Sequence, residues 1–375
     1  MFSAKTMRKI DLRMIPLILA LMTISLLVIS AMTGQVRELE REEFFTPFVK
    51  KQLQWFAIGW ACFLFFSAID YHKLRKWAPF LYVGMILMLL GLFFAPAIQN
   101  VHRWYRFGGL TVQPSEYAKL IVVIALSAFL EYKAARTRET GAALQALLLI
   151  GVPFLLILKQ PDLGTALVLF PIALVMFYFG QIKRRVLLVM GLLGMSCLIF
   201  VSLLFLGVIS HDKLRPYVTK VIKEYQYERL SPDTYHQTAS QTSIALGGVT
   251  GSGWRKSEFA GRKWLPEAHT DSVFAAYAEE FGLVGTGLLL CLFFSLIYCS
   301  FQVTAVAKDR FGRLLSSGIT VYLCVHILIN CAMMCGFLPI TGVPLVLVSY
   351  GGSSVLATMI ALGILQSIYS RRFLF

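Results

Sequence analysis

The feature that most constrains the fold of this chain is a series of apolar runs, each about 20 residues long, separated by short charged loops. A helix of about 20 residues crosses a hydrocarbon layer about 30 Å thick, and it satisfies its own backbone polar groups inside lipid. Strands of a membrane barrel would instead show shorter segments of alternating polarity. The chain is 57% hydrophobic and only 15% charged, which supports membrane-spanning helices.

Ten such helices are predicted, so the expected fold class is an all-α integral membrane protein. Residues 1–375 are interpreted as one membrane domain, because no separate soluble domain is evident. Residues 1–209 carry helices 1–7, residues 210–283 form a long loop, and residues 284–375 carry helices 8–10. The predicted spans are 14–32, 53–69, 77–96, 117–132, 143–158, 163–182, 186–209, 284–304, 314–336 and 348–368.

Basic residues mark every second loop of this arrangement. They precede the first span, recur in alternate loops, as at Lys183, Arg184 and Arg185, and end the chain. The positive-inside rule assigns these loops to the cytoplasm, so both termini are predicted to be cytoplasmic and loop 210–283 to lie outside. The net charge of +15 then reflects loop topology and contact with anionic lipid, and no nucleic-acid partner is expected.

Ionisable groups gather near the outer ends of apolar helices, where they are costly and therefore candidates for function. The first cluster contains Arg103 and Trp104, then Gln113, Glu116 and Lys119. Glu116 and Lys119 are three residues apart and share a helix face. From spacing alone, a structural ion pair with interfacial anchors is as good an account as a functional one.

A second cluster is the predicted hairpin around Asp162. Taken alone, this carboxylate is better interpreted as the N-cap of the following helix than as a functional group. Two further polar residues, Gln237 and Gln241, lie one helical turn apart in the long loop. His326 and Asn330 fall inside the ninth predicted span, where a hydrogen-bonded pair within the bundle is expected and no function is assigned.

The densest cluster holds Glu267, His269, Thr270 and Asp271, followed by two glutamates at 279–280. A carboxylate partly removed from water gains proton affinity and can act as a general base. Asp271 and Glu279 are eight residues apart, on one helical face, and paired carboxylates can hold a divalent cation. The alternative, a capped and solvated helix start, is less favoured because the cluster is so dense.

A fourth cluster, residues 336–354, combines proline and glycine with Ser349, Gly351 and Ser353. This composition forbids a regular helix, and irregular backbone at membrane depth survives only when it is buried in protein or lines a cavity. The hydroxyls and amides suit a polar head group. The alternative is a reentrant packing loop without ligand contact.

Together the motifs resemble the SEDS family of cell-wall proteins over almost the whole chain. Five stretches in the family's order carry the resemblance: RWYRFGGLTVQPSEYAKL, KQPDLGTAL, YHQTASQTSIALGG, LPEAHTDSVFAAYAEEFGLVG and LPITGVPLVLVSYGGSS. The chain is more similar to the RodA branch than to the FtsW branch, which usually has a lysine before the glycine equivalent to Gly342. Ser252 and Ser272 depart from the family pattern.

The resemblance implies a multi-pass protein of the bacterial inner membrane that polymerises lipid II into peptidoglycan as a processive, inverting glycosyltransferase. It implies Asp271 as the general base, with Glu116 and Lys119 also catalytic, and an Mg²⁺ or Mn²⁺ ion is expected near Glu116, Asp162 and Asp271. Expected partners are a class B penicillin-binding protein transpeptidase and other membrane proteins of the elongation complex. A lipid II flippase and a non-catalytic scaffold remain alternatives. The candidate substrate-binding residues are Arg103, Trp104, Gln113, Asp162, Gln237, Gln241, Glu267, His269, Thr270, Ser349, Gly351 and Ser353.

Overall fold

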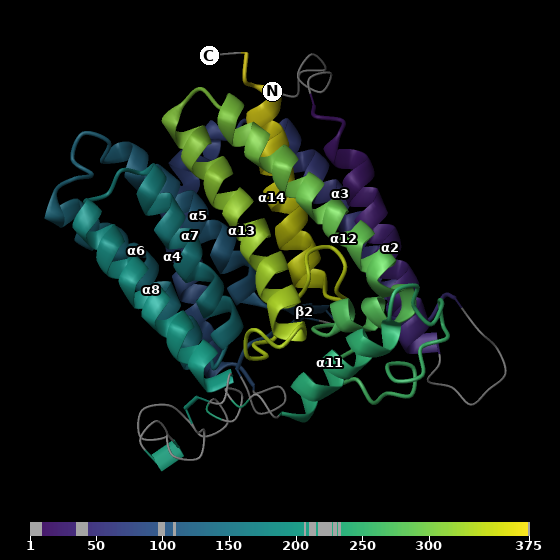
Figure 1. The fold of residues 1–375 in the computed structure, drawn as a ribbon. Coiled ribbons are helices and arrows are strands. Elements are labelled where there is room, and N and C mark those ends of the chain that lie inside the picture. The colour runs from purple at the N-terminus through teal and green to yellow at the C-terminus, as the bar shows by residue number, and fades with distance from the viewer. Residues whose placement is uncertain are drawn as a thin grey trace.

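The computed structural model places a long helix on every predicted span, which confirms the all-α membrane fold (Figure 1). It describes residues 10–34, 44–96, 102–107, 110–205, 208–209, 215–216, 227, 231 and 234–373. The long helices are α2 (Met14–Gly34), α3 (Pro47–Ala68), α4 (His72–Gly91, extended by the 3-10 turn η1, Leu92–Phe94), α5 (Pro114–Tyr132), α6 (Thr140–Lys159), α7 (Leu163–Phe179), α8 (Arg184–Phe205), α12 (Val273–Val306), α13 (Arg310–Met334) and α14 (Gly352–Ser370).

Smaller elements complete the described part of the chain. A shorter helix, α11 (Tyr235–Gly247), lies within the predicted long loop. The strands β1 (Tyr105–Phe107) and β2 (Leu110–Val112) pair antiparallel, with Tyr105 opposite Val112. The hairpin was not expected from the sequence.

Seven of the described helices are long and apolar enough to cross a membrane: α2, α4 with η1, α6, α8, α12, α13 and α14. Helix α7 is equally apolar but has only 17 residues. Helix α5 carries Glu116, Lys119 and Glu131 within its 19 residues. The membrane-protein class is confirmed, and ten as the number of crossings stays a prediction.

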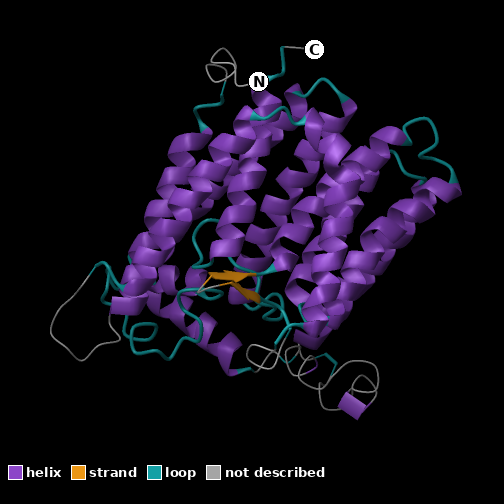
Figure 2. Ribbon diagram, turned by 180° about the vertical axis from the view of Figure 1, so that it is seen from behind, coloured by secondary structure: helices purple, strands orange, loops and turns teal. Residues whose placement is uncertain are grey.

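The two ends of the bundle differ in character (Figures 1 and 2). At one end, called the inner end below, the described chain starts and finishes. There the Asp11 amide donates to Gln366 Oε1 at 2.9 Å, and Gln366 Nε2 donates to the Asp11 carbonyl at 3.1 Å. The β-hairpin, α11 and the loop before α14 lie at the opposite end, called the outer end. Both described termini at one end agree with the predicted topology.

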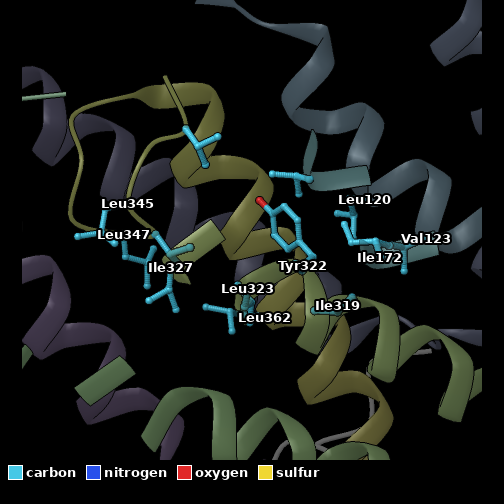
Figure 3. Packing of buried hydrophobic residues seen from close by; sticks show 14 of the residues in the cluster. Leu120, Val123, Ile172, Ile319, Tyr322, Leu323, Ile327, Leu345, Leu347 and Leu362 are labelled. Carbon is cyan, nitrogen blue, oxygen red and sulfur yellow. The ribbon is translucent and has the colours of Figure 1, made fainter. Parts of the chain in front are cut away.

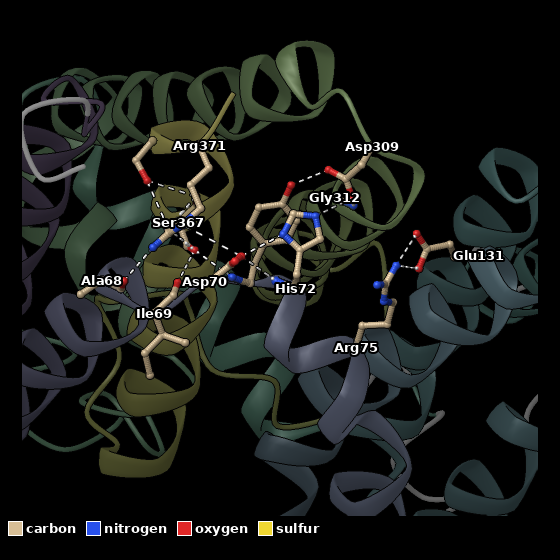
Figure 4. A network of polar contacts seen from close by, with 12 residues as sticks. Ala68, Ile69, Asp70, His72, Arg75, Glu131, Asp309, Gly312, Ser367 and Arg371 are labelled. Carbon is tan, nitrogen blue, oxygen red and sulfur yellow. Dashed lines mark hydrogen bonds and ion pairs between the residues drawn. The ribbon is translucent and has the colours of Figure 1, made fainter. Parts of the chain in front are cut away.

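Polar contacts join the short loops at the inner end (Figure 4). Arg371, just after α14, donates to the Ala68 carbonyl at 2.7 Å and to Ser367 Oγ at 2.7 Å. His72 Nδ1 lies 2.8 Å from Asp70 Oδ1 at the start of α4. These contacts fix the end of α14 against the turn between α3 and α4.

Helix α13 lies in the centre of the bundle. Its side chains pack with α5, α7 and α14 in a layer that includes Leu120, Ile172, Tyr322 and Leu362 (Figure 3). The most apolar stretch of α13 is 72% buried, whereas that of α8 has no buried residue. A central helix that touches several neighbours can therefore position groups from all of them.

Helix α12 begins at Val273, earlier than the predicted span 284–304, so the expected loop 210–283 ends in helix. The helix kinks at Gly282, which has φ 62°. A Cβ on Gly282 would lie 2.3 Å from the Gly251 nitrogen, so glycine is required by both the backbone angle and the close approach. The turns before the kink place the Asp271 motif directly at a helix start.

Candidate active site

A buried ion pair occupies the outer start of α5. Lys119 Nζ lies 2.7 Å from Glu116 Oε1 and 2.9 Å from His326 Nε2 of α13, and all three residues are at most 3% exposed. An ammonium only donates, so Nε2 of His326 accepts and the ring proton lies on Nδ1, which faces the Pro344 carbonyl at 3.5 Å. The Glu116–Lys119 ion pair that the three-residue spacing predicted is present. It also contacts His326, which the spacing along α5 could not predict.

The other Glu116 oxygen, Oε2, is buried and has no hydrogen-bond partner. Two of the three Lys119 donors are used within the protein. The pair is thus held inside the bundle, where it positions α5 against α13, rather than displayed at a surface.

Asp162 is the N-cap of α7, as the sequence favoured. Its carboxylate accepts from the Thr165 amide at 3.3 Å and from Thr165 Oγ1 at 2.9 Å. It also accepts from Ser115 Oγ at 2.8 Å and Gln113 Nε2 at 3.1 Å. The cap therefore also ties the start of α7 to the start of α5.

Asp271 lies at the outer end, immediately before α12. Asn330 of α13 donates through Nδ2 to the Asp271 carbonyl at 3.0 Å and to the Val343 carbonyl at 2.7 Å. A Cβ built on Gly342 would lie 3.2 Å from Asp271 Oδ2, so the carboxylate lies directly against the loop before α14. Gly342 has φ 77°, which favours a residue without a side chain.

The residues before Asp271 are bound to the same loop. The Ser349 hydroxyl donates to the Thr270 carbonyl at 2.7 Å, and the Tyr350 amide donates to the His269 carbonyl at 2.9 Å. Thr270 Oγ1 donates to Glu267 Oε2 at 2.7 Å. The predicted cluster around Asp271 and the predicted cluster of residues 336–354 are therefore joined by hydrogen bonds.

The His269 ring packs edge-on against Phe48, with ring centroids 5.0 Å apart, and against Tyr350 at 5.8 Å. Burial among these rings lowers the pKa of His269 below its ordinary value, and the Glu267 charge offsets only part of that effect. The ring is therefore neutral at pH 7.

Several predicted substrate-binding residues instead have structural contacts. Ser353 Oγ accepts from the Gln113 amide at 3.0 Å, and the Gly351 amide donates to Gln52 Oε1 at 3.4 Å. Gln237 is buried and donates to the Met333 carbonyl at 2.6 Å. Gln241 is exposed on α11, beside Gly336. Their role toward a substrate stays a prediction.

Arg103 and Trp104 lie beside the hairpin at the outer end and are half-buried. Arg103 Nε donates to the Gln160 carbonyl at 3.0 Å, which joins the hairpin to the turn before α7. Glu279, considered with Asp271, is bound elsewhere: it accepts from the amides of Phe259 and Ala260 at 2.8 and 3.0 Å. Of these two carboxylates, Asp271 is therefore the one that faces the loop before α14.

Within the described ranges, no three His, Cys, Asp or Glu side chains are grouped so as to hold a metal ion. The Asp162 carboxylate accepts four hydrogen bonds, and the Glu116 carboxylate forms an ion pair with Lys119. Within these ranges Glu116, Asp162 and Asp271 are thus not grouped as a three-ligand site, and a cation near them stays a prediction.

His326 and Asn330 organise the site, although no function was assigned to them. They do not pair with each other: His326 contacts Lys119, and Asn330 contacts Asp271 and the loop before α14. Four residues apart, they lie on one face of α13 and about 6 Å apart along its axis. The sequence feature that could have indicated their role is the four-residue spacing of two polar residues within an apolar helix.

The whole architecture matches known proteins. The family model described as cell cycle protein (FtsW, RodA, SpoVE) matches residues 12–372. Peptidoglycan glycosyltransferase MrdB of Escherichia coli K12 is 32% identical over 366 residues, which cover 97% of this chain and 94% of the relative. A probable peptidoglycan glycosyltransferase FtsW from Trichlorobacter lovleyi is 31% identical over 86% of this chain and 83% of its own length.

Solved structures agree with these matches. The rod shape determining protein RodA of Thermus thermophilus superposes with a TM-score of 0.70 at 26% identity, covering 97% of this chain and 98% of that one. A chain from a peptidoglycan synthase complex that coordinates polymerization and crosslinking gives a TM-score of 0.76 at 27% identity, with the same coverage. The fold, the order of the motifs and the match over residues 12–372 place this chain in the FtsW/RodA/SpoVE family, the SEDS family that its motifs indicated.

Proposed function

We propose that this protein is a peptidoglycan glycosyltransferase of the bacterial inner membrane that polymerises lipid II for cell elongation. The curated relatives bear this activity in their names. The rod-shape relative MrdB covers more of this chain than the FtsW relatives do, 97% against 86%, which favours the elongation role.

The proposed reaction is an inverting glycosyl transfer at the outer end of the bundle. The 4-hydroxyl of an N-acetylglucosamine on lipid II attacks the anomeric carbon of the growing strand, and undecaprenyl pyrophosphate leaves. A sugar hydroxyl is a poor nucleophile at neutral pH, so its proton must be taken by a positioned base. We assign that role to the Asp271 carboxylate.

One observation carries this proposal: α13 holds Asp271 and the Glu116–Lys119 pair on one face, through Asn330 and His326. Residues from α5, α13, the segment before α12 and the loop before α14 therefore meet within about one helical turn. Such preorganisation is what a base needs, since a displacement of about 1 Å can cost about a hundredfold in rate.

The leaving pyrophosphate requires positive charge. Lys119 faces inward, so Arg103 and the basic residues of the outer loops are the better candidates to contact it. A divalent cation would have to draw part of its coordination from the pyrophosphate itself, because the described residues contain no ready cluster of ligands. Mg²⁺ or Mn²⁺ therefore stays a prediction, tested by chelation in the assay below.

The test uses purified protein and labelled lipid II, with product length read on a gel. Asp271→Asn keeps the size and removes the basicity, and we expect the rate to fall by about a hundred- to ten-thousandfold. Glu258→Gln removes one charge from an exposed position of the same outer segment and should leave the rate unchanged. Near wild-type polymerisation by Asp271→Asn would remove it as the base.

The wild-type protein also decides between the alternatives. Movement of lipid II across vesicles without polymer formation would favour a flippase, and neither activity would favour a scaffold. We further propose a class B penicillin-binding protein transpeptidase as the partner, supported by the likeness to a chain of a peptidoglycan synthase complex. Co-purification of the two proteins from membranes tests this partner.

A further inference from the structure

A cavity of about 800 Å³ opens at the inner end of the bundle, between α4, α5 and α6. Its wall is apolar and includes Pro79 and Val83 of α4, Ala125 and Ala128 of α5, and Leu149 of α6. This volume falls in the range of pockets that hold a drug-sized molecule, which is also enough for part of an acyl chain.

The sequence explains why the helices leave this space. Pro79 lies inside α4 and has no N–H to donate to the Arg75 carbonyl, so one backbone hydrogen bond of that helix is missing at the wall of the cavity. Across from it, Ala125 and Ala128 present only methyl groups. The Tyr82 hydroxyl donates to the Leu149 carbonyl at 2.9 Å and so closes one side.

Basic residues border the cavity. Arg75 and Lys76 belong to its lining, as does one acid, Glu131, whose two carboxylate oxygens both lie 3.1 Å from Arg75 Nη1 (Figure 4). Lys76 is exposed, and Lys133 stacks over the Tyr132 ring at 5.6 Å. Arg75 and Lys76 against Glu131 leave the lining with a net positive charge, and Lys133 adds a further cation next to the lining residue Tyr132.

Helices α4 and α6 expose apolar side chains next to residues that line the cavity: Phe80 (72%) follows Pro79, and Leu148 (57%) precedes Leu149. Such side chains are suited to lipid contact, so we expect the cavity to open toward the bilayer. By the predicted topology, the basic rim lies at the level of the cytoplasmic head groups. An occupant thus needs an apolar chain for the wall and a negative head group for the rim.

We propose that this cavity binds an anionic phospholipid of the cytoplasmic leaflet. Arg75 and Lys76 hold its phosphate at the rim, and an acyl chain lies between α4, α5 and α6. Basic pockets between membrane helices on the cytoplasmic side have the chemistry for such head groups. The site is separate from the candidate active site, because Glu131 lies about 18 Å along α5 from Lys119.

The test measures which lipids stay bound to the purified full-length protein after exchange into mixed micelles with phosphatidylglycerol or phosphatidylcholine, by native mass spectrometry. We expect preferential retention of phosphatidylglycerol. Arg75→Gln with Lys76→Gln should weaken it roughly thirtyfold, which corresponds to about 1 kcal/mol for each basic residue. Ala128→Leu keeps every charge but fills the wall, and should also lower retention.

The matched control is Arg184→Gln with Arg185→Gln, an exposed pair at the start of α8 that does not line the cavity. Equal loss in the control would mean nonspecific surface attraction and overturn the site. Equal retention of the two lipids, or unchanged retention in Ala128→Leu, would also overturn it. Displacement by glycerol phosphate alone would show a phosphate site rather than a lipid site.

Discussion

The buried pair at the start of α5 supports a quantitative prediction. Lys119 and Glu116 have side chains that are 1% and 4% exposed, with 2.7 Å between Nζ and Oε1. Lys119→Met removes the cation and leaves a buried carboxylate, one oxygen of which already has no partner. Glu116→Gln leaves the ammonium without its counter-ion. Each single change therefore creates an uncompensated buried charge.

Removing one partner of a buried pair costs about 3–5 kcal/mol, whereas replacing both by uncharged side chains of similar size is often nearly neutral. The double variant Glu116→Gln with Lys119→Met should thus be more stable than either single variant. We expect a coupling energy of about 3 kcal/mol. His326 loses its donor in both variants that lack Lys119, so this loss cancels in the cycle.

The assay is thermal unfolding of the four proteins in one detergent, with polymerisation of lipid II as a second readout. Arg136 and Glu139 provide the control, because they have the same three-residue spacing but are 71% and 63% exposed. Their coupling should be at most about 0.5 kcal/mol. Additive losses at Glu116 and Lys119 would refute the argument that the two charges compensate each other within the bundle.

Three further predictions test other parts of the structure. Ser231→Cys, in a background without native cysteines, should react with a membrane-impermeant thiol reagent in intact spheroplasts; labelling only after lysis would reverse the topology. Gly282→Ala should destabilise by well over 1 kcal/mol in thermal unfolding, because its φ of 62° and the close backbone leave no room for Cβ, whereas Gly84→Ala, with open space around it, should be neutral or stabilising. Burial lowers the pKa of His269 in the folded protein, so the unfolded state takes up the proton first as the pH falls. The stability that His269 contributes should therefore be fully present above pH 6.5 and decrease as the pH drops below that value. His269→Phe should flatten this dependence when the melting temperature is measured over a series of pH values.

Much of the architecture followed from local sequence properties. Apolar runs of membrane length must be helices, since backbone groups in lipid have no other partners, and each predicted span overlaps an observed helix. The Asp162 cap was also predictable, because a cap involves residues three positions apart. The start of α12 was placed too late, because Glu279 and Glu280 interrupt the apolar pattern before the kink at Gly282, although both are buried in the helix.

The sequence by itself thus determined the fold class, the alternation of basic loops and the motifs at the outer end, all of which depend on composition or on neighbours along the chain. Only the tertiary structure decided which side chains meet. Lys119 and His326 are 207 positions apart, and Asn330 and Asp271 are 59 apart. Their contacts depend on how α5, α12 and α13 pack, and packing is set by the shapes of all the helices together rather than by any one segment.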